Sequence, residues 1–290
     1  MLLGFDEYAM QARRLAEALD RPLHIVQRHR FPDGEYRIAL PPALPRQVIV
    51  CQSLNYPNEK LVELMLVAKT ARDLGAETLT LIAPYLCYMR QDKAFHPGEA
   101  VSQTIIGGFL ADLFDNVVTV DPHLHRVRYL QQAIPASNAL ALTATSLMAE
   151  FLQGRVEDPV LIGPDAEAEQ WVSSVAIPNQ CSYGVCNKTR LGDESVEIVL
   201  PEISLRGRNV VLVDDVASSG QTLLVAAREC FAKQAKQVDV LVTHGLFFNS
   251  ADQRMIQAGV RHVWSTDSVT HDSNVIPLSG LLGDAVLSLA

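Results

Sequence analysis

Short runs of apolar residues alternate along the chain with longer segments in which apolar positions recur every three or four residues. The short runs predict buried strands at residues 47–51, 78–83, 116–120, 159–163, 210–213, 238–243 and 260–264. The longer segments predict helices at residues 59–74, 101–112, 141–151, 166–175 and 222–232. This alternation is typical of an α/β protein with a mostly parallel sheet flanked by helices.

The alternation occurs in two series, which are separated by turn-forming residues at 134–138 (IPASN). We therefore place a domain boundary near residue 140 and expect two α/β domains, residues 1–140 and 141–290. An internal echo supports a duplication, since residues 116–121 read NVVTVD and residues 209–214 read NVVLVD. If the halves are copies of one unit, these two strands occupy equivalent places.

The composition is that of a folded protein, because 48% of the 290 residues are hydrophobic. The formal net charge of −9 argues against nonspecific binding of nucleic acid, but it allows a local basic pocket for a nucleotide. The five cysteines form no CxxC pair, so we expect free thiols and a cytoplasmic protein. The N-terminus does not resemble a signal peptide, and no apolar run approaches membrane-spanning length.

The most informative segment is residues 210–222, VVLVDDVASSGQT. An apolar run ends in Asp214 and Asp215, and a turn of small residues then leads to Thr222 and the next helix. Loops after parallel strands bind ligands, and a helix N-terminus favours phosphate. The two carboxylates would repel an adjacent phosphate and instead suit sugar hydroxyls, so the segment fits ribose 5-phosphate. The alternative is an acidic strand end that only caps the helix.

Two other loops after predicted strands carry side chains that suit a nucleotide. Arg90 and Gln91 begin the sequence RQDK, and together they can bind phosphate and read a base edge. His123 lies in DPHLH and suits a phosphate or a Mg²⁺–nucleotide contact, partly through water because magnesium prefers oxygen ligands. The alternatives are a solvated charged loop and a histidine that only satisfies backbone groups.

Three further segments carry charged residues in loop contexts. Residues 31–35 read FPDGE, for which an ordinary hairpin turn is the alternative. Asp165 directly follows a predicted strand and could hold a metal ion or a ribose hydroxyl. Lys188 and Arg190 lie in the polar stretch 186–195, where two cations could stabilise a transferring phosphoryl group. Plain surface charge is the alternative for this last pair. The chain contains no P-loop, GxSxG or HExxH motif.

Seven segments, in this order, resemble the ribose-phosphate pyrophosphokinase (phosphoribosyl pyrophosphate synthetase) family: FPDGE, PYLCYMRQDK, VDPHLH, GPD, NKTR, VDDVASSGQT and VTHG. The short length and Ser218 resemble the archaeal-type branch. The resemblance implies two phosphoribosyltransferase-like domains, the first with the ATP-side motifs and the second with the ribose 5-phosphate loop. It also implies transfer of the diphosphoryl group of ATP to the C1 hydroxyl of ribose 5-phosphate, giving phosphoribosyl pyrophosphate and AMP.

The resemblance further implies roles for individual residues. The positions that match ATP-binding residues are Phe31, Asp33, Glu35, Arg90, Gln91 and His123. The positions that match ribose 5-phosphate-binding residues are Asp214, Asp215, Ser218, Ser219, Gly220 and Thr222. The positions that match Mg²⁺ contacts are His123 and Asp165, and those that match the catalytic pair are Lys188 and Arg190. Because the Phe31 segment reaches the adenine from a neighbouring subunit in this family, at least a homodimer is implied.

The sequence departs from the family's pattern at two places. AEAE follows Asp165 in place of a glycine pair, and Gln221 replaces a usual glycine. Two other functions are compatible with parts of the sequence: a non-catalytic homologue that binds nucleotide or sugar phosphate, and a phosphoribosyltransferase that consumes phosphoribosyl pyrophosphate. Retention of Lys188 and Arg190 argues against the first, and two domains with an ATP-type RQ pair argue against the second.

Overall fold

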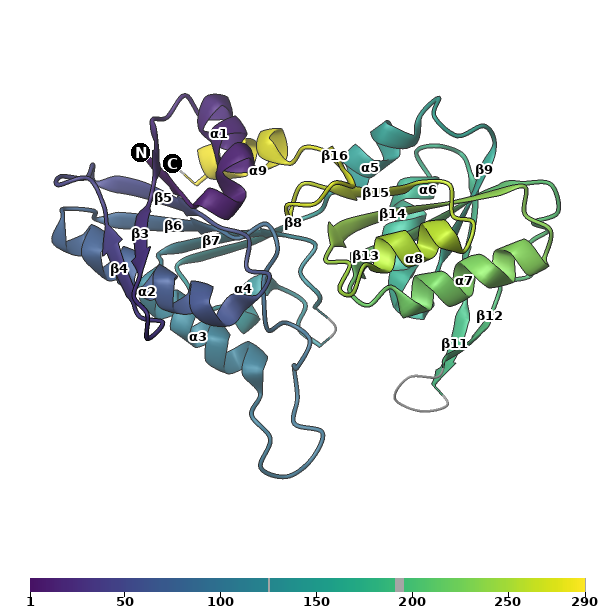
Figure 1. Cartoon of the computed structure of the whole chain (residues 1–290), viewed down its shortest axis with the longest axis horizontal. Coiled ribbons are helices and arrows are strands. Elements are labelled where there is room, and N and C mark those ends of the chain that lie inside the picture. Colours follow the sequence, from purple (N-terminus) through teal and green to yellow (C-terminus); the bar gives the residue numbers. More distant parts are fainter. Residues whose placement is uncertain (125, 191–195, 290) are drawn as a thin grey trace. The chain divides into compact units, whose positions relative to one another are not determined.

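A computed structural model describes residues 1–124, 126–190 and 196–289, without the side chains of residues 188–190, 196 and 197. The chain forms two compact units (Figure 1). Unit 1 comprises Met1–Leu142, Ser268–Thr270 and the C-terminal segment from Pro277. Unit 2 comprises Thr143–Asp267 and His271–Ile276.

Unit 1 is built on a six-stranded parallel sheet in the order β2-β1-β5-β6-β7-β8. Its strands are β1 (Leu2–Gly4), β2 (Leu23–Ile25), β5 (Gln47–Cys51), β6 (Thr78–Ile82), β7 (Asn116–Val120) and β8 (Asn138–Leu142). An antiparallel hairpin is formed by β3 (Gln27–Arg30) and β4 (Tyr36–Ala39). The central strands are mostly apolar and are buried along nearly their whole length because helices cover both faces of the sheet.

The helices of unit 1 divide between the two faces of this sheet (Figure 1). On one face lie η1 (Asp6–Tyr8), α1 (Ala9–Ala18) and α9 (Ser279–Leu287). On the other lie α2 (Pro57–Asp73), α3 (Ser102–Leu113) and α4 (Leu130–Ala133). The last helix of the chain therefore packs on α1 in unit 1, whereas a linear division at residue 140 assigns it to the second domain.

Unit 2 has a second six-stranded parallel sheet, in the order β10-β9-β13-β14-β15-β16. Its strands are β9 (Pro159–Gly163), β10 (Ser182–Val185), β13 (Asn209–Ala217), β14 (Gln237–Gly245), β15 (Val263–Thr266) and β16 (Asn274–Ile276). The second hairpin consists of β11 (Asn187–Arg190) and β12 (Val196–Val199). The helices of this unit are α5 (Thr145–Leu152), η2 (Ala166–Ala168), α6 (Glu169–Ala176), α7 (Gln221–Ala232) and α8 (Ala251–Gln257).

The two units repeat one topology. In each, the second strand takes the sheet edge beside the first, a hairpin follows, and four more strands extend the sheet in chain order. By this order β13 corresponds to β5, whereas β7 corresponds to β15. The prediction that the two NVV segments occupy equivalent places is therefore wrong. Buried central strands all require β-branched apolar runs, so their sequences can resemble each other without a shared position.

Several predicted elements are confirmed: β5, β7 and β9 have the predicted bounds, and α7 begins one residue early. Two predicted helix starts are wrong. The helix expected at residues 59–74 begins at Pro57, because proline is favoured in the first helical turn. The helix expected at 141–151 begins at Thr145, since residues 141 and 142 complete β8 by pairing with β7. No helix within the described ranges is long and apolar enough to cross a membrane.

Candidate functional site

The acidic pair Asp214–Asp215 lies inside β13 rather than in a loop after it. The strand continues to Ala217 because its backbone still pairs with β14, with Asp214 opposite Val242. The prediction that this strand ends at Val213 is therefore wrong, since ladder hydrogen bonds hold the backbone extended whatever the polarity of the side chains. Asp214 is half-buried and Asp215 is buried at the carboxyl end of the sheet.

Three carboxylates influence one another at this end of unit 2. Burial raises the pKa of Asp214 well above its ordinary value, and the charges of Asp215 and Asp165 raise it further. Asp165 follows β9, which is the neighbour of β13 in the sheet. The structure thus brings Asp165 together with the acidic pair, as the carboxyl ends of adjacent parallel strands predict. A divalent cation or sugar hydroxyls would relieve the repulsion between these groups.

The turn at Ser218–Gly220 joins β13 to α7. Gly220 has φ +67° as the N-cap, and a Cβ there would lie 2.9 Å from Cβ of Ala251, so the position favours glycine. The carbonyl of Ser218 accepts from the N–H of Phe248 at 3.0 Å, and that of Ser219 accepts from Arg254 at 2.6 Å. The N-cap Gly220 has no side chain to cap α7, and the hydroxyl of Ser219 accepts only a long hydrogen bond of 3.5 Å from the N–H of Gln221, so this terminus suits an anion.

The departures after Asp165 lie at the protein surface. Glu167 and Glu169 are exposed, and the carboxylate of Asp165 accepts a hydrogen bond from the N–H of Glu167 at 3.1 Å. Asp165 therefore also caps the short helix η2. Within the described ranges, no three His, Cys, Asp or Glu side chains converge closely enough to hold a metal ion. The carboxylate oxygens at this end of unit 2 could supply only a few of the ligands of a Mg²⁺ ion. Such an ion would keep other ligands, such as water.

In unit 1, the loops after β6 and β7 lie side by side because these strands are paired. Arg90 is exposed in the first loop, and Gln91 is half-buried and accepts from the N–H of Gln103 through its carbonyl. His123 is half-buried in the second loop. An ion pair of 3.3 Å between Asp92 and Arg126 joins the two loops. The sheet thus brings the predicted ATP-side loops together at its carboxyl edge.

FPDGE forms the turn of the β3–β4 hairpin, which confirms a hairpin turn there. The N–H of Phe31 donates to the carbonyl of Glu35 at 2.8 Å, and Gly34 has φ +95°. Asp33 accepts from the N–H of Glu35 at 3.2 Å. The side chains of Phe31, Asp33 and Glu35 are exposed, and they stand on a sheet separate from the six-stranded one. The structure therefore presents them outward.

The stretch expected to be a loop at 186–195 is in part a strand. Asn187–Arg190 pairs antiparallel with Val196–Val199, because the chain returns along itself. Residues 191–195 and the side chains of Lys188 and Arg190 lie outside the described part of the chain. The backbone places both predicted catalytic residues on β11.

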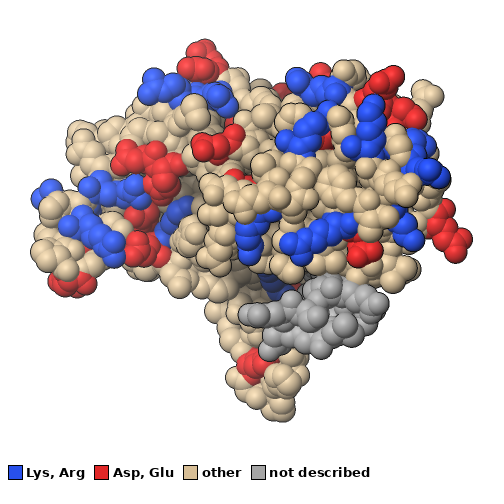
Figure 2. All heavy atoms as spheres, turned by 45° about the vertical axis from the view of Figure 1, so that its right-hand side comes forward, with Lys and Arg blue, Asp and Glu red and all other residues tan. Residues whose placement is uncertain are grey.

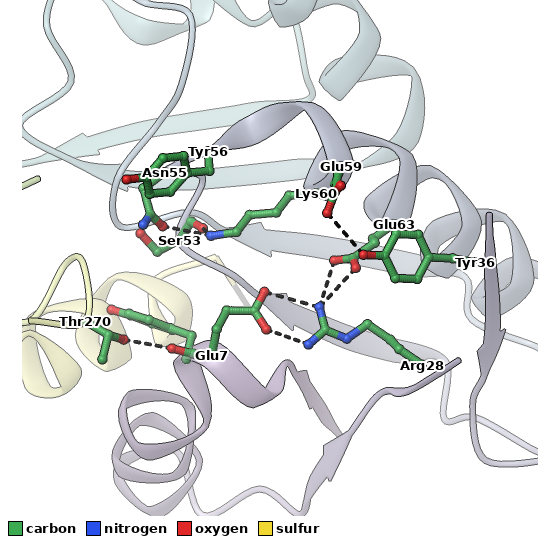
Figure 3. Close-up of a pocket in the computed structure, with 11 residues that line it drawn as sticks. Glu7, Arg28, Tyr36, Ser53, Asn55, Tyr56, Glu59, Lys60, Glu63 and Thr270 are labelled. Atoms are coloured by element: carbon green, nitrogen blue, oxygen red, sulfur yellow. Dashed lines mark hydrogen bonds and ion pairs between the residues drawn. The ribbon is translucent and has the colours of Figure 1, made fainter. Parts of the chain in front are cut away.

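A cavity of about 450 Å³ in unit 1 contains a charged network that the sequence analysis missed (Figure 3). Arg28 donates to Glu7 at 2.6 Å and to Glu63 at 3.0 and 3.1 Å. Gln52 donates to the same carboxylates at 3.1 and 3.2 Å. One signal was present: Glu63 lies among the apolar positions of the predicted helix, four residues before Val67, where a charge needs a buried partner.

Figure 2 shows acidic and basic side chains interspersed over the face that it draws. The net charge of −9 is thus not gathered into one acidic surface on that face. Binding chemistry in the described residues is therefore better sought in local groups at the carboxyl ends of the sheets than in a broad charged surface.

Comparisons with known proteins cover the whole chain. Residues 1–113 match the model of the N-terminal domain of ribose phosphate pyrophosphokinase, and residues 131–279 match that of the phosphoribosyl transferase domain. The chain is 35% identical to ribose-phosphate pyrophosphokinase of Methanopyrus kandleri, over 100% of this chain and 99% of the relative. It is 32% identical to that of Methanothermobacter thermautotrophicus, over 99% of both chains.

A solved structure supports the fold over the same extent. The crystal structure of phosphoribosylpyrophosphate synthetase from Mycobacterium smegmatis matches with a TM-score of 0.85 at 22% identity, over 100% of this chain and 98% of that chain. The chain therefore has the α/β architecture of two phosphoribosyltransferase-type units, each with a parallel six-stranded sheet flanked by helices.

Proposed function

Since the chain belongs to the ribose-phosphate pyrophosphokinase family, we propose that it transfers the diphosphoryl group of ATP to the C1 hydroxyl of ribose 5-phosphate. The products are phosphoribosyl pyrophosphate and AMP. The observation that carries this proposal is the meeting of Asp165, Asp214 and Asp215 beside the uncapped N-terminus of α7. Acidic acceptors for sugar hydroxyls and donors for a phosphate lie next to each other there.

Ribose 5-phosphate binds at the carboxyl end of β13. Asp214 and Asp215 accept hydrogen bonds from the vicinal hydroxyls, which relieves the repulsion that raises the pKa of Asp214. The turn holds the 5-phosphate through hydroxyl and backbone donors of Ser218, Ser219, Gly220 and Thr222. A phosphate fits here because no side chain occupies the cap of this helix.

ATP binds on the side of unit 1. Arg90 contacts its phosphates, Gln91 reads a base edge, and His123 lies at the adjoining strand end. Phe31, Asp33 and Glu35, on the outward-facing hairpin turn, reach the adenine of ATP bound to a neighbouring copy of the chain. The active form is therefore at least a homodimer.

The transfer needs positioning and charge neutralisation rather than a covalent intermediate. The bond from the sugar C1 oxygen to the β-phosphorus forms as the bond from that phosphorus to the oxygen bridging it to the α-phosphate breaks. AMP leaves with the bridging oxygen, and the proton of the C1 hydroxyl is released to solvent. Lys188 and Arg190, from the β11 hairpin, neutralise charge on the transferring group. Asp165 in unit 2 and His123 in unit 1 would each serve as a Mg²⁺ contact, His123 partly through water, and a bound ion would neutralise phosphate charge.

One assay tests this function. The protein is mixed with ATP and Mg²⁺, and AMP is followed with and without ribose 5-phosphate. AMP that forms only with the sugar phosphate supports the proposal, and a protein carrying both Asp214→Asn and Asp215→Asn is expected to form none. Binding of both ligands without any AMP would instead identify a non-catalytic homologue.

A further inference from the structure

Arg28, Glu7 and Glu63 line the cavity of unit 1 (Figure 3), and the buried Gln52 donates to both carboxylates; we name these four residues the Arg28 clamp. Its inner part is removed from solvent, since Glu63 is 2% exposed, Gln52 is fully buried and the Arg28 side chain is 19% exposed, whereas the Glu7 side chain, at 36% exposed, forms the outer edge. Nη1 of Arg28 donates to both carboxylate oxygens of Glu63 and, at 3.3 Å, to Glu7, while Nη2 donates to Glu7 at 2.6 Å. A planar guanidinium with two carboxylates fixes direction as well as distance.

Glu7 and Arg28 stay charged at neutral pH, as the directions of their pKa shifts show. Burial raises the pKa of Glu7, but hydrogen bonds from the backbone, Arg28 and Gln52, together with the charge of Arg28, lower it overall. Burial likewise lowers the pKa of Arg28, whereas Glu7 and Glu63 raise it by more. A charged network with these directional hydrogen bonds holds one geometry, and each partner left alone would be costly to bury.

The four residues of the clamp come from four separate parts of unit 1. Arg28 lies in β3, three residues before the turn that begins at Phe31. Glu7 lies in η1 after β1, Gln52 directly follows β5, and Glu63 lies in α2. The clamp therefore ties the base of the hairpin to the six-stranded body of the unit.

A weaker tether acts closer to the turn. Arg30 pairs with Glu59 at 2.9 Å, and the hydroxyl of Tyr36 donates to the same carboxylate at 3.1 Å. This tether joins both hairpin strands to α2, but Arg30 and Glu59 are more than half exposed and so contribute little rigidity. A two-stranded hairpin is only marginally stable by itself. The direction in which the β3–β4 hairpin points from unit 1 therefore depends on the clamp.

We propose that Arg28 is a positioning residue for ATP recognition: through Glu7, Glu63 and Gln52 it sets where the FPDGE turn presents its side chains to the adenine. This inference rests on the proposed function, because that function assigns the turn to ATP. Arg28 itself touches no substrate. The clamp acts on the affinity for one substrate and leaves the transfer step and the ribose 5-phosphate site unchanged.

The test compares Arg28→Met with Arg46→Met in the full-length protein. Arg46 pairs with Glu77 in the same unit, but its side chain is 80% exposed, so it matches the charge removed without touching the clamp. Arg28→Met is expected to raise the KM for ATP about tenfold, equivalent to ~1.4 kcal/mol. The KM for ribose 5-phosphate and kcat are expected to stay within about twofold, as in Arg46→Met. Arg28→Lys should restore only part of the loss, because an ammonium lacks the fork that spans two carboxylates.

Hydrogen exchange supplies a readout independent of activity. Amides of residues 27–39 should exchange faster in Arg28→Met than in Arg46→Met, while those of β5, β6 and β7 keep their protection. Glu7→Gln keeps the side-chain volume and weakens only the contact of residue 7 with Arg28. If Arg28→Met does not fold, Glu7→Gln is expected to raise the KM for ATP by a smaller factor, again with little change in the KM for ribose 5-phosphate.

The outcomes distinguish this inference from the proposed function. If the unaltered protein forms AMP and the folded Arg28 variant keeps its KM for ATP, the inference is overturned and the function stands. Equal rises in both KM values, with protection lost throughout unit 1, also overturn it, because they indicate general destabilisation. If the unaltered protein forms no AMP from ATP and ribose 5-phosphate, both the function and the inference built on it are wrong.

Discussion

The two units share a topology, but they treat acidic groups at corresponding strand ends in opposite ways. In unit 1, Glu7 follows the first strand of the sheet, and Arg28 from the hairpin binds it, so the pKa of Glu7 is lowered overall. In unit 2, Asp165 follows the corresponding strand and adds its charge to burial and to Asp215, so the pKa of Asp214 is raised. In unit 1 an arginine neutralises the carboxylate, whereas in unit 2 neighbouring carboxylates raise the pKa of Asp214.

The N-termini of α2 and α7, which follow the corresponding strands β5 and β13, also differ between the two units. Both begin after a residue with positive φ, Tyr56 before α2 and Gly220 before α7, and neither has a side-chain cap. In unit 1 the ammonium of Lys60 reaches back to the carbonyl of Ser53 at 2.6 Å and to Asn55 at 2.7 Å. In unit 2 the turn consists of small residues. A repeated fold can thus line one helix start with small residues and place a lysine side chain at the other.

The largest expected effect concerns the hairpin of unit 2. Lys188→Ala should lower kcat by about 10²–10⁴-fold, because a cation that stabilises transferring charge is lost. Steady-state kinetics with both substrates measures the change, and their KM values should shift far less. Lys236→Ala, which removes an exposed cation of the same unit, is the control. A Lys188 variant with full turnover would remove this residue from the mechanism.

The next effect separates the two acidic sites directly. Asp214→Asn should weaken ribose 5-phosphate binding by about 10²-fold or more, since a half-buried charged acceptor of a sugar hydroxyl is lost. In the absence of ligand, the same change should raise the Tm at neutral pH, because it removes a carboxylate whose pKa is raised by burial and repulsion. Calorimetric titration and thermal unfolding give the two quantities. A lower Tm would contradict the repulsion inferred for unit 2.

Removing Glu63, the buried partner of Arg28, should lower the stability of the protein, whereas Asp214→Asn should raise it. Glu63→Leu deletes a buried carboxylate from the Arg28 clamp and leaves the guanidinium with Glu7 and exposed Asp6. The expected cost is about 3 kcal/mol, the usual range for breaking one side of a buried ion pair. Arg46→Met, at an exposed pair, should cost under about 1 kcal/mol. Urea unfolding of both variants measures the two losses in unfolding free energy.

A smaller effect is expected from pH, with opposite signs in the two units. Because the pKa of Asp214 is raised in the folded state, unit 2 loses stability as pH rises from the ordinary carboxyl pKa through the raised value. Because the pKa of Glu7 is lowered, its contribution to unit 1 is complete above the ordinary pKa and is lost as pH falls through the lowered value. Hydrogen exchange of α7 and α2 between about pH 8 and about pH 4, corrected for intrinsic rates, separates the two. Parallel changes in both helices would contradict the contrast.

The sequence by itself determined the α/β class, the bounds of β5, β7 and β9, and the segments that identify the family. These features are local, because burial imposes a period on neighbouring residues and a strand–turn–helix motif is contiguous in the chain. The acidic pair in VVLVDDVASSGQT could be selected for the same reason.

Only the tertiary structure decided which places in the two units correspond, how far β13 continues, and where α9 packs. It alone also showed the Arg28 clamp, whose members Glu7, Arg28, Gln52 and Glu63 lie on four segments of the chain. Strand order, ladder length and buried ion pairs depend on groups that are distant in sequence and meet only after folding. A residue's own neighbours in the chain carry no record of such a partner.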